Sequence, residues 1–402
     1  MKNIQNITKD LLYIGSSDRK LSLFEAVYPV VDGVSYNSYL LVDDKTVLFD
    51  TVDKHCCEQF FENLKAGLDG KNLDYFIINH LEPDHSALIK KVIEKYNNVK
   101  LVCNAKTKQM LAQFFEFDFD IENNFQIVKE GDILSTENHE FTFIMAPMVH
   151  WPEVMVTYDK KDKILFSADA FGSFGALNGN IFDSETELNI NEYRRYYTNI
   201  VGKYGTQVNA LLNKASSHEI NMICPLHGVI IKENISKLVN LYSKWANYEA
   251  EINSVLIAYA SVYGGTQNAA EVLATKLSQK GIKNIKMHDV SMVHHSFILS
   301  DAFKYSHVVI AAPTYNNGIF IKMEQFINDI VSHNLQNRTY AIIENGSWAP
   351  NCASAIKTKL ENLKGSNFIE NKITIKSTPK ENQEEEIEKL VNSIVNDIKK
   401  EG

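Results

Sequence analysis

The stretch His80-Leu-Glu-Pro-Asp-His85 decides the prediction for the N-terminal part of this 402-residue chain. It places two imidazoles and two carboxylates, those of His80, Glu82, Asp84 and His85, within one short segment. Metal-ligand side chains spaced this closely are typical of a metal centre. The alternative is a solvated loop in which Asp84 caps a helix predicted at 86–96. The spacing favours the metal centre.

Three further side chains of ligand type follow later in the chain: His150, Asp169 and His227. Each comes just past an apolar run that we expect to form a strand, at 141–146, 163–167 and 220–224, respectively. The ends of strands are where α/β enzymes place their chemistry. Taken singly, each of these residues would be read as an ordinary part of the fold. Together with the first stretch they extend the candidate metal centre.

The complete set of seven side chains has four imidazoles and three carboxylates and includes no thiolate. A cysteine-rich tetrahedral zinc site is therefore excluded, whereas zinc, manganese and iron all accept mixed nitrogen and oxygen ligands. Seven side chains are too many for one tetrahedral ion. We therefore expect two ions that share a bridging carboxylate, for which Asp169 is the candidate.

Composition and charge limit the class of protein. The chain is 45% hydrophobic and 23% charged, which is ordinary for a soluble globular protein of two or three domains. A formal net charge of −9 argues against nucleic acid as the main partner, because a basic surface is needed to offset phosphate charge. The first fifteen residues lack a signal-peptide core, and no apolar run is long enough to span a bilayer. We expect a cytoplasmic protein without a membrane partner.

The cysteines at 56, 57, 103, 224 and 352 form no Cys-x-x-Cys pair. An iron–sulfur cluster, a rubredoxin-type iron site and a dithiol relay are therefore not predicted. Cys224 has a zinc-like spacing to His227, but it closes an apolar strand and is interpreted as part of the core. His294 and His295 are expected on a solvent-facing loop without a ligand role.

The pattern of apolar residues changes near residue 250. Before it we expect mixed sheets flanked by helices, with strands at 21–28, 35–42, 46–50, 75–78, 100–103 and within 140–166, and helices at 54–68, 86–96, 107–115, 189–203 and 232–251. After it, strands expected at 254–259, 285–289, 307–312, 339–344 and 372–376 alternate with helices. This alternation predicts a doubly wound parallel sheet. The predicted domains are 1–250 and 251–402.

The first strand of the second domain runs into Ser261-Val-Tyr-Gly-Gly-Thr266, ahead of a helix expected at 268–280. A hydroxyl- and glycine-rich turn at a helix N-terminus binds phosphate through backbone N–H groups. The turn lacks the signatures of nucleoside triphosphatases and of dinucleotide-binding folds, which favours a monophosphate.

Aromatic residues follow the third and fourth strands of this domain, in Pro313-Thr-Tyr-Asn316 and Asn345-Gly-Ser-Trp348. A planar ring between Tyr315 and Trp348, with its phosphate at Thr266, describes flavin mononucleotide (FMN). The alternative is ordinary turns with incidental aromatics. The candidate FMN-binding residues are Ser261, Val262, Tyr263, Gly264, Gly265, Thr266, Pro313, Thr314, Tyr315, Asn316, Asn345, Gly346, Ser347 and Trp348.

This arrangement resembles the flavodiiron proteins, also called A-type flavoproteins. The resemblance implies a metallo-β-lactamase-like αββα domain carrying a non-haem diiron site, fused to a flavodoxin-like domain carrying FMN. It covers nearly the whole chain. It rests on the motif from His80 to His85, the later His150, Asp169 and His227 in this order, and the turn at 261–266. The segment 33–39 also resembles an early strand segment of the family.

The resemblance also implies which residues hold each iron. One ion is bound by His80, Glu82, His150 and Asp169. The other ion is bound by Asp84, His85, Asp169 and His227, so that Asp169 bridges the two. Zinc hydrolases of the same superfamily usually have histidine at the position of Glu82, and the additional carboxylate favours iron. One departure is the loop 345–350, where Trp348-Ala-Pro350 replaces a glycine-richer segment and leaves the flavin contacts there open.

The implied activity is the reduction of dioxygen to water, of nitric oxide to nitrous oxide, or of both, with electrons passed through FMN. The family forms a head-to-tail homodimer that places the flavin of one chain beside the iron site of the other, and we expect that dimer, with a dimer of dimers left open. Because the chain ends at Gly402 after one flavodoxin-like domain, we expect a separate electron donor, namely a rubredoxin, a deazaflavin or a flavin reductase.

Two other classes of function remain open at this point. One is a zinc-dependent hydrolase of the metallo-β-lactamase fold fused to an FMN electron-transfer module, against which Glu82 and the aromatic residues speak. The other is an electron carrier that uses only the flavin, which would leave the seven-residue set unexplained. The residues do not choose between dioxygen and nitric oxide, nor among the electron donors.

Overall fold

The computed structural model describes residues 1–117 and 121–401, and these form two compact units. The first unit comprises Met1–Tyr197 and Thr206–Ser243, and the second comprises Thr198–Gly205 and Lys244–Gly402, of which Gly402 itself lies outside the described residues. The short segment 198–205, which belongs to the second unit, interrupts the first unit in sequence. We retain the predicted domains, 1–250 and 251–402, as a proposal.

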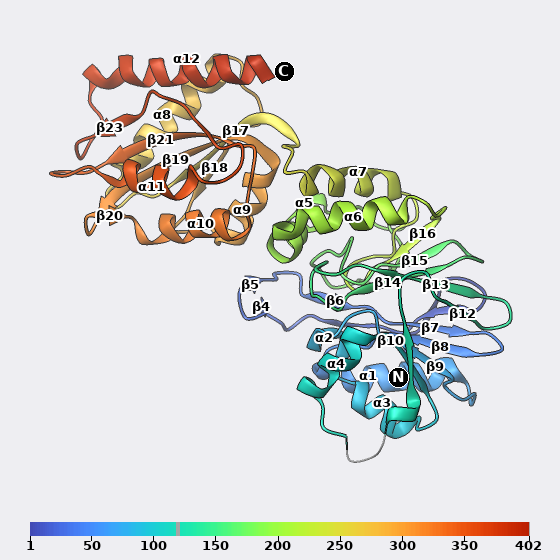
Figure 1. Cartoon of the computed structure of the whole chain (residues 1–402). Helices are drawn as coiled ribbons and strands as arrows, with labels where there is room; N and C mark the ends of the chain where they lie inside the picture. The colour runs from blue at the N-terminus through green and yellow to red at the C-terminus, as the bar shows by residue number, and fades with distance from the viewer. Residues whose placement is uncertain (118–120, 402) are drawn as a thin grey trace. The chain divides into compact units, whose positions relative to one another are not determined.

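The first unit is built on two facing sheets (Figure 1). One sheet has the strand order β1 (Gln5–Asn6), β2 (Leu11–Tyr13), β7 (Tyr39–Val42), β8 (Thr46–Phe49), β9 (Tyr75–Ile77), β10 (Lys100–Asn104), β11 (Phe125–Val128). The other sheet has the order β12 (Ile133–Ser135), β13 (Glu140–Met145), β14 (Met155–Asp159), β15 (Ile164–Phe166), β16 (Met222–Cys224). Both sheets mix parallel and antiparallel pairs, as predicted.

The hydrophobic core of the first unit lies between these two sheets. Phe49 on β8 stacks on Phe166 on β15, with ring centroids 3.9 Å apart. Helices cover the outer faces: α1 (Cys57–Leu68), α3 (Ile89–Lys95) and α4 (Ala105–Phe114) lie on one side, and α5 (Ile190–Tyr196), α6 (Gly205–Ala215) and α7 (Ile235–Ala246) on the other (Figure 1). This is the αββα arrangement that the family resemblance implies, and it agrees with the mixed sheets flanked by helices that the apolar pattern predicts. Cys224 is buried in the core, as expected.

Several predicted elements of this unit are wrong in extent; the helix predicted at 232–251, for example, is α7 and spans only Ile235–Ala246. The strand predicted at 21–28 is a small hairpin, β4 (Leu23–Phe24) and β5 (Tyr28–Pro29), because Glu25 and Ala26 adopt positive φ and turn the chain. The helix predicted at 86–96 is α3 alone, and Ser86 instead ends a separate short helix, α2 (Pro83–Ser86). The helix predicted at 189–203 stops at Tyr196 and continues as a π-helical turn, Tyr197–Val201.

The strand predicted at 35–42 is also interrupted. It forms β6 (Val34–Tyr36), which pairs with β3 (Ser16–Asp18), and β7. Between them the side-chain amide of Asn37 donates hydrogen bonds to the carbonyl oxygens of Pro225 and Gly228, 2.8 Å away in each case. These bonds fix the loop that carries His227.

Asp183 anchors the segment that leads into α7. Its buried carboxylate accepts hydrogen bonds from the backbone N–H groups of Lys232, Glu233 and Asn234 and from the side-chain amide of Asn234. Burial would raise the pKa of Asp183, but these hydrogen bonds hold it below its ordinary value.

Replacing Asp183 with asparagine is therefore expected to lower the free energy of unfolding by about 2–4 kcal/mol at neutral pH. Because the pKa of the folded state is the lower one, the stabilisation by Asp183 is complete above the ordinary carboxyl pKa of about 3.9 and is lost as the pH falls through the lowered value. Urea unfolding of both proteins between pH 7 and pH 3 gives the difference between their free energies of unfolding. This difference should be constant over most of the range and should become smaller only at the acid end. A difference that increases as the pH falls would contradict the role of the Asp183 carboxylate.

The second unit is a doubly wound sheet, as predicted. Its main path has the order β18 (Lys286–Asp289), β17 (Ile252–Tyr259), β19 (Tyr305–Tyr315), β21 (Thr339–Asn345), β22 (Asn367–Phe368), and β23 (Ile373–Ile375) also pairs with β21. These pairs are all parallel, whereas the short β20 (Gly318–Ile319) returns antiparallel to β19. The change of direction in strand order falls between β17 and β19, which is where such folds bind ligands.

Helices cover both faces of this sheet (Figure 1). Helices α8 (Gly265–Gln279) and α12 (Glu384–Glu401) share one hydrophobic core with the strands. Helices α9 (His295–Lys304), α10 (Ile321–Ser332) and α11 (Cys352–Leu360) pack against one another in sequence. Helix α8 begins at Gly265 and not at the predicted 268, so the glycine pair lies at its N-terminus.

The prediction of a solvent-facing loop at His294 and His295 is wrong. His294 is the N-cap of α9, and its ring accepts a hydrogen bond from the backbone N–H of Ser296. His295 is half-buried and forms an ion pair with Asp329 on α10. Among residues 1–117 and 121–401, none of the helices combines the length and the apolar character that a bilayer crossing requires.

Candidate metal centre and flavin site

The motif from His80 to His85 begins shortly after the end of β9 and runs into the short helix α2. Pro83 is the first residue of that helix, a position that suits its fixed φ and missing N–H. The Ser86 hydroxyl donates to the carbonyl oxygen of Leu81, 2.7 Å away, and closes the turn. The backbone oxygen of His85 accepts hydrogen bonds from the N–H and the hydroxyl of Thr51. The fold therefore holds the loop that carries four of the seven predicted side chains.

The structure brings all seven predicted side chains together in two groups. The first group, which we call the His150 position, is formed by His80, Glu82, His150 and Asp169. The second group, which we call the His227 position, is formed by Asp84, His85 and His227. Within each group the candidate ligand atoms lie within 4.8 Å of one another.

At the His150 position both imidazoles present Nε2 to the carboxylates. The Nε2 atom of His150 lies 2.9 Å from Glu82 Oε2 and 3.2 Å from Asp169 Oδ2. The Nε2 atom of His80 lies 3.3 Å from Glu82 Oε2 and 3.1 Å from Asp169 Oδ2. Four donor atoms thus converge on one point.

At the His227 position the Nε2 atoms of His85 and His227 face each other at 2.9 Å. They lie 3.3 and 3.2 Å, respectively, from Asp84 Oδ2. The same two atoms lie 3.4 and 3.7 Å from the other oxygen of Asp169, Oδ1. Asp169 therefore turns one oxygen toward each group, which is the geometry of a bridging ligand.

The chemistry of these donors fits two cations. Both oxygens of Asp84 and both oxygens of Asp169 are buried without a hydrogen-bond partner among the described residues. Burial lowers the pKa of His80, but Asp169, Glu153 and Glu82 raise it well above its ordinary value. Burial raises the pKa of Asp169, but the imidazoles lower it far below its ordinary value. Buried carboxylates of this kind require positive charge, which protons or metal ions can supply.

Two buried carboxylates outside the predicted set orient the motif. Asp50, at the end of β8, accepts hydrogen bonds from the backbone N–H groups of Asn79 and His80 and from the Asn79 side-chain amide, at 2.8, 3.2 and 2.8 Å. Burial raises its pKa to about 6. Glu153 lies 2.9 Å from the Nδ1 atom of His80 and 2.9 Å from the backbone N–H of Leu81. Neither residue was predicted, although Asp50, like Asp169, comes at the end of an apolar strand.

Aromatic side chains surround the His227 position. The ring of His227 has edge contacts with Phe24 and Tyr36, at centroid distances of 5.4 and 5.7 Å, and lies 5.3 Å from Tyr196. On the other side, Trp151 contacts His80 edge-on at 5.4 Å. These rings separate the donor groups from bulk water. Nothing in the spacing of these aromatic residues along the chain would have identified them.

In the second unit the predicted phosphate-binding turn lies at the N-terminus of α8. Gly264 has a φ of 88° and its N–H is bonded to the Ser261 hydroxyl at 3.1 Å, which closes the turn. The side chains of Val262 and Tyr263 are exposed, whereas Thr266 is buried. The Asn345 amide donates to the Thr266 hydroxyl at 3.2 Å and links the turn to the end of β21.

The other predicted flavin residues lie on neighbouring loops at the same end of the sheet. Pro313 pairs with Asn345 in the β19–β21 ladder, and Asn316 has positive φ in the turn before β20. Trp348 is 92% exposed and Tyr315 is partly exposed, so both can offer a ring face to a ligand. The Thr314 hydroxyl accepts hydrogen bonds from the N–H groups at the start of α11, which gives this residue a role in the fold.

A loop after β23 also contacts the turn and was not predicted. Ser377, which has a φ of 69°, bonds through its N–H and its carbonyl oxygen to the side-chain amide of Asn345. Its hydroxyl donates to Ser347 at 2.9 Å, and Gly346 bonds to the Ile375 carbonyl. A Cβ atom added at Gly265 would lie 2.2 Å from the Ser377 carbonyl oxygen. Only glycine allows this close approach.

Replacing Gly265 with alanine is therefore expected to displace the turn and to weaken FMN binding about tenfold or more, which corresponds to about 1.4 kcal/mol. Flavin fluorescence titration of the flavin-free protein measures this. The substitution Ser278→Ala, at an exposed position near the other end of α8, serves as the control and should leave the affinity unchanged. Equal affinities for all three proteins would contradict the role of Gly265.

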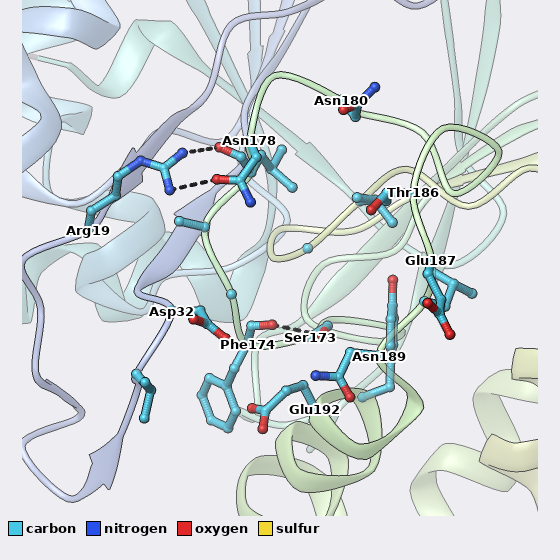
Figure 2. Close-up of a pocket in the computed structure, with 18 residues that line it drawn as sticks. Arg19, Asp32, Ser173, Phe174, Asn178, Asn180, Thr186, Glu187, Asn189 and Glu192 are labelled. Carbon is cyan, nitrogen blue, oxygen red and sulfur yellow. Dashed lines mark hydrogen bonds between the residues drawn. The ribbon is translucent and has the colours of Figure 1, made fainter.

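Two other features of the first unit do not belong to this site. A pocket of about 440 Å³ is lined by polar residues that include Asp32, Glu187 and Glu192, and the Arg19 guanidinium at its rim donates to Asn178 and Leu177 (Figure 2). The lining residues include none of the seven metal-type side chains. Elsewhere, Asp10, His139 and Asp162 form a third ligand-type group. There the ammonium of Lys161 lies 2.8 Å from both Asp10 and His139 and supplies the positive charge.

Fold and site together define the class: an oxidoreductase that joins a metallo-β-lactamase-like domain to a flavodoxin-like domain. The family described as ODP family beta lactamase matches residues 34–228, and the flavodoxin family matches residues 257–389. The chain is 30% identical to an anaerobic nitric oxide reductase flavorubredoxin of Aliivibrio fischeri, over 88% of this chain and 72% of that protein. It is also 30% identical to an uncharacterised protein of Methanocaldococcus jannaschii, over 94% of each.

The solved structures agree. The chain superimposes on the rubredoxin oxygen:oxidoreductase of Desulfovibrio gigas with a TM-score of 0.91, at 27% identity over 98% of each chain. It shares the fold of the flavodiiron protein of Giardia intestinalis, with a TM-score of 0.91 at 24% identity. The chain belongs to the flavodiiron protein family, and its cofactors are a diiron centre and FMN.

Proposed function

We propose that this protein reduces dioxygen to water, nitric oxide to nitrous oxide, or both, at a diiron centre that receives its electrons through FMN. The observation that carries the proposal is the position of Asp169, whose two oxygens face two separate groups of histidine and carboxylate donors. A hydrolase with one catalytic zinc ion needs no such pair of positions.

The assignment of ligands follows the two groups. His80, Glu82 and His150 would hold one iron, and Asp84, His85 and His227 would hold the other, with Asp169 available to both. Carboxylates in both positions suit iron better than an all-imidazole set would. When bound, the two irons and FMN would supply the electrons for the reduction of a diatomic gas.

The protein's own residues keep the donor atoms in place. Asp50 fixes the backbone at Asn79 and His80 through three hydrogen bonds. The Nδ1 atom of His227 donates to the carbonyl oxygen of Ser35 at 2.7 Å, which leaves its Nε2 atom free to bind a metal. The rings of Phe24, Tyr36 and Tyr196 pack around His227 and line the His227 position with apolar surface.

The second unit provides the flavin site. We assign the FMN phosphate to the turn 261–266 and the N-terminus of α8, and the flavin ring to the loops that carry Tyr315 and Trp348. The remaining residues of the predicted set, in 313–316 and 345–348, shape these loops. We also propose the head-to-tail homodimer of the family, a cytoplasmic location, and a separate electron donor such as a rubredoxin or a flavin reductase.

The relatives support both gases as substrates. The Aliivibrio protein is named a nitric oxide reductase, and the Desulfovibrio protein is named an oxygen oxidoreductase. The alternative of a zinc-dependent hydrolase fused to an FMN module loses its basis, since the chain belongs to the flavodiiron family. The relative rates for the two gases are the property that an experiment has to determine.

The test compares the two gases under one electron donor. Purified protein loaded with iron and FMN is reduced anaerobically, and the loss of dioxygen and of nitric oxide is followed on electrodes. Faster loss of dioxygen without accumulated peroxide identifies an oxygen reductase, and faster loss of nitric oxide identifies a nitric oxide reductase. If neither gas is consumed above the rate of the iron-free protein, the proposal fails.

A further inference from the structure

The two metal positions have direct ligands of the same types. A difference between the two ions would therefore have to arise from the residues around these ligands. Each position has two imidazoles, one carboxylate of its own and the shared carboxylate of Asp169. The direct ligands therefore give both ions the same formal charge. Any inequality between the ions must come from groups that contact the ligands from outside.

One such difference is Glu153, which contacts an imidazole ligand of the His150 position only. Its Oε1 atom lies 2.9 Å from the Nδ1 atom of His80, and both side chains are fully buried. The same oxygen also accepts from the N–H of Leu81 at 2.9 Å, and an ionised carboxylate has no proton to donate. His80 therefore donates from Nδ1 to Glu153, and its Nε2 atom faces Glu82 and Asp169.

The position of Glu153 is fixed from a third element. Its carbonyl oxygen accepts a hydrogen bond from the side-chain amide of Asn104, at 2.6 Å. Asn104 is in turn held as the N-cap of α4, where its side-chain oxygen accepts from the N–H groups of Lys106 and Thr107. The carboxylate is thus a built part of the site and not a mobile surface charge.

At the His227 position, among the described residues, no carboxylate is hydrogen-bonded to the Nδ1 atom of either imidazole; the buried Asp50 interacts with His85 through space only. The Nδ1 atom of His227 donates to a neutral acceptor, the carbonyl oxygen of Ser35. The Nδ1 atom of His85 is buried without a hydrogen-bond partner in the part of the chain that the structure describes. At the His150 position, a carboxylate therefore accepts from the Nδ1 atom of one imidazole ligand. At the His227 position, a neutral carbonyl group accepts from the Nδ1 atom of one imidazole ligand.

We propose that Glu153 makes the two metal positions unequal, so that the His150 position binds a divalent ion more tightly than the His227 position and holds the iron that is oxidised more readily. A carboxylate behind a ligating imidazole increases the basicity of the ligand and fixes its orientation, and removing such a partner typically weakens metal binding 10- to 100-fold. An additional negative charge close to a metal also favours its higher oxidation state. Glu153 is a positioning residue in this account. The inference rests on the diiron assignment proposed above.

The test is a titration of the metal-free protein with cobalt(II) under nitrogen, followed by the absorption of the bound ion, for the unaltered chain and for Glu153→Gln. Glutamine keeps the length of the side chain and one acceptor oxygen but removes the charge. We expect two binding steps of unequal affinity in the unaltered protein. The substitution should weaken the tighter step by about 10- to 100-fold and leave the weaker step unchanged.

The matched control is Asp159→Asn. Asp159 is a buried carboxylate in the same unit that lies 2.9 Å from the Nδ1 atom of His139, a histidine outside the metal site. The substitution Asp159→Asn removes a buried carboxylate–imidazole pair of the same kind, but neither residue is a proposed metal ligand. Metal binding should therefore not change. Circular dichroism shows whether each variant is folded.

Three results would overturn the inference: two equal binding steps in the unaltered protein, an equal weakening of both steps in Glu153→Gln, or the same loss in Asp159→Asn. If the unaltered protein bound no pair of ions at all, the proposed function itself would fail, and the two failures are thereby distinguished.

In iron-loaded protein, the reduction potential of the iron that is oxidised first should rise in Glu153→Gln. A potential that does not move would contradict the second part of the inference.

Discussion

Replacing Asp169 with asparagine is expected to abolish gas reduction, with a loss of about 10³-fold or more, on the scale seen when a catalytic group is removed. The asparagine side chain has the same shape, but it carries no charge and cannot offer an anionic oxygen to both groups of donors. The two oxygens of Asp169 lie 3.1 Å from His80 Nε2 and 3.4 Å from His85 Nε2. Bound iron should fall from two ions per chain to one or none.

The measurement is iron content together with gas consumption on an electrode, after reconstitution with iron and FMN. The control is Asp162→Asn, which changes a carboxylate of the same unit in the cluster around Lys161. FMN content should be unchanged in both variants, because the flavin site lies in the other unit. Full activity in Asp169→Asn would exclude the bridging role.

Replacing Asp50 with alanine is expected to be the most destabilising change near the site. It leaves three N–H donors without an acceptor: the backbone groups of Asn79 and His80 and the side-chain amide of Asn79. Each unsatisfied buried group costs about 1–3 kcal/mol, so the free energy of unfolding should fall by about 3–5 kcal/mol. The loop that carries His80 should also lose its fixed position, and iron binding should weaken.

The matched control for this prediction is Asp50→Asn. Its side-chain oxygen can still accept from the two backbone N–H groups. The Asn79 amide can turn over, so that its oxygen accepts from the new amide and its nitrogen donates to the hydroxyl of Thr157, which now lies 2.8 Å from the Asn79 oxygen. We therefore expect a loss below about 1.5 kcal/mol for this variant. Urea unfolding of the metal-free proteins measures the loss of stability in Asp50→Ala and in Asp50→Asn. Equal losses in the two variants would show that the unsatisfied N–H groups do not cause the destabilisation.

The sequence predicted the fold class correctly, because the apolar runs alternate with helices in the second domain and because turn residues separate the strands of the first. It also singled out seven side chains that the structure brings together, since ligand-type residues at strand ends stand out against an apolar background. Their assignment as iron ligands stays a prediction. The same holds for the fourteen candidate flavin residues.

The residues that the sequence did not reveal act through contacts between distant segments. Glu153 contacts His80, 73 positions earlier, and the carbonyl group of Ser35 contacts His227, 192 positions later. A backbone acceptor such as that of Ser35 has no signature in the sequence, because every residue carries one. Ser377 was missed for the same reason, since its contacts with Asn345 depend on the packing of β23 beside β21.

Local turn chemistry explains the errors in the boundaries. Glu25 and Ala26 adopt positive φ although neither is a residue that favours it, so the short hairpin β4–β5 was taken for one strand. Helix α2 is a single turn that starts at Pro83, inside the motif. Its length is set by the packing of His85 and Ser86, both buried, and not by helix propensity.

The central claim is that two iron ions are bound as a pair bridged by Asp169. Its most direct test is the Mössbauer and electron paramagnetic resonance spectra of the oxidised protein after loading with two equivalents of iron. The account predicts a magnetically coupled pair of ferric ions without a resonance signal from isolated ferric iron, and loss of this coupling in Asp169→Asn. Two uncoupled ferric ions in the unaltered protein, or a single bound ion, would contradict it.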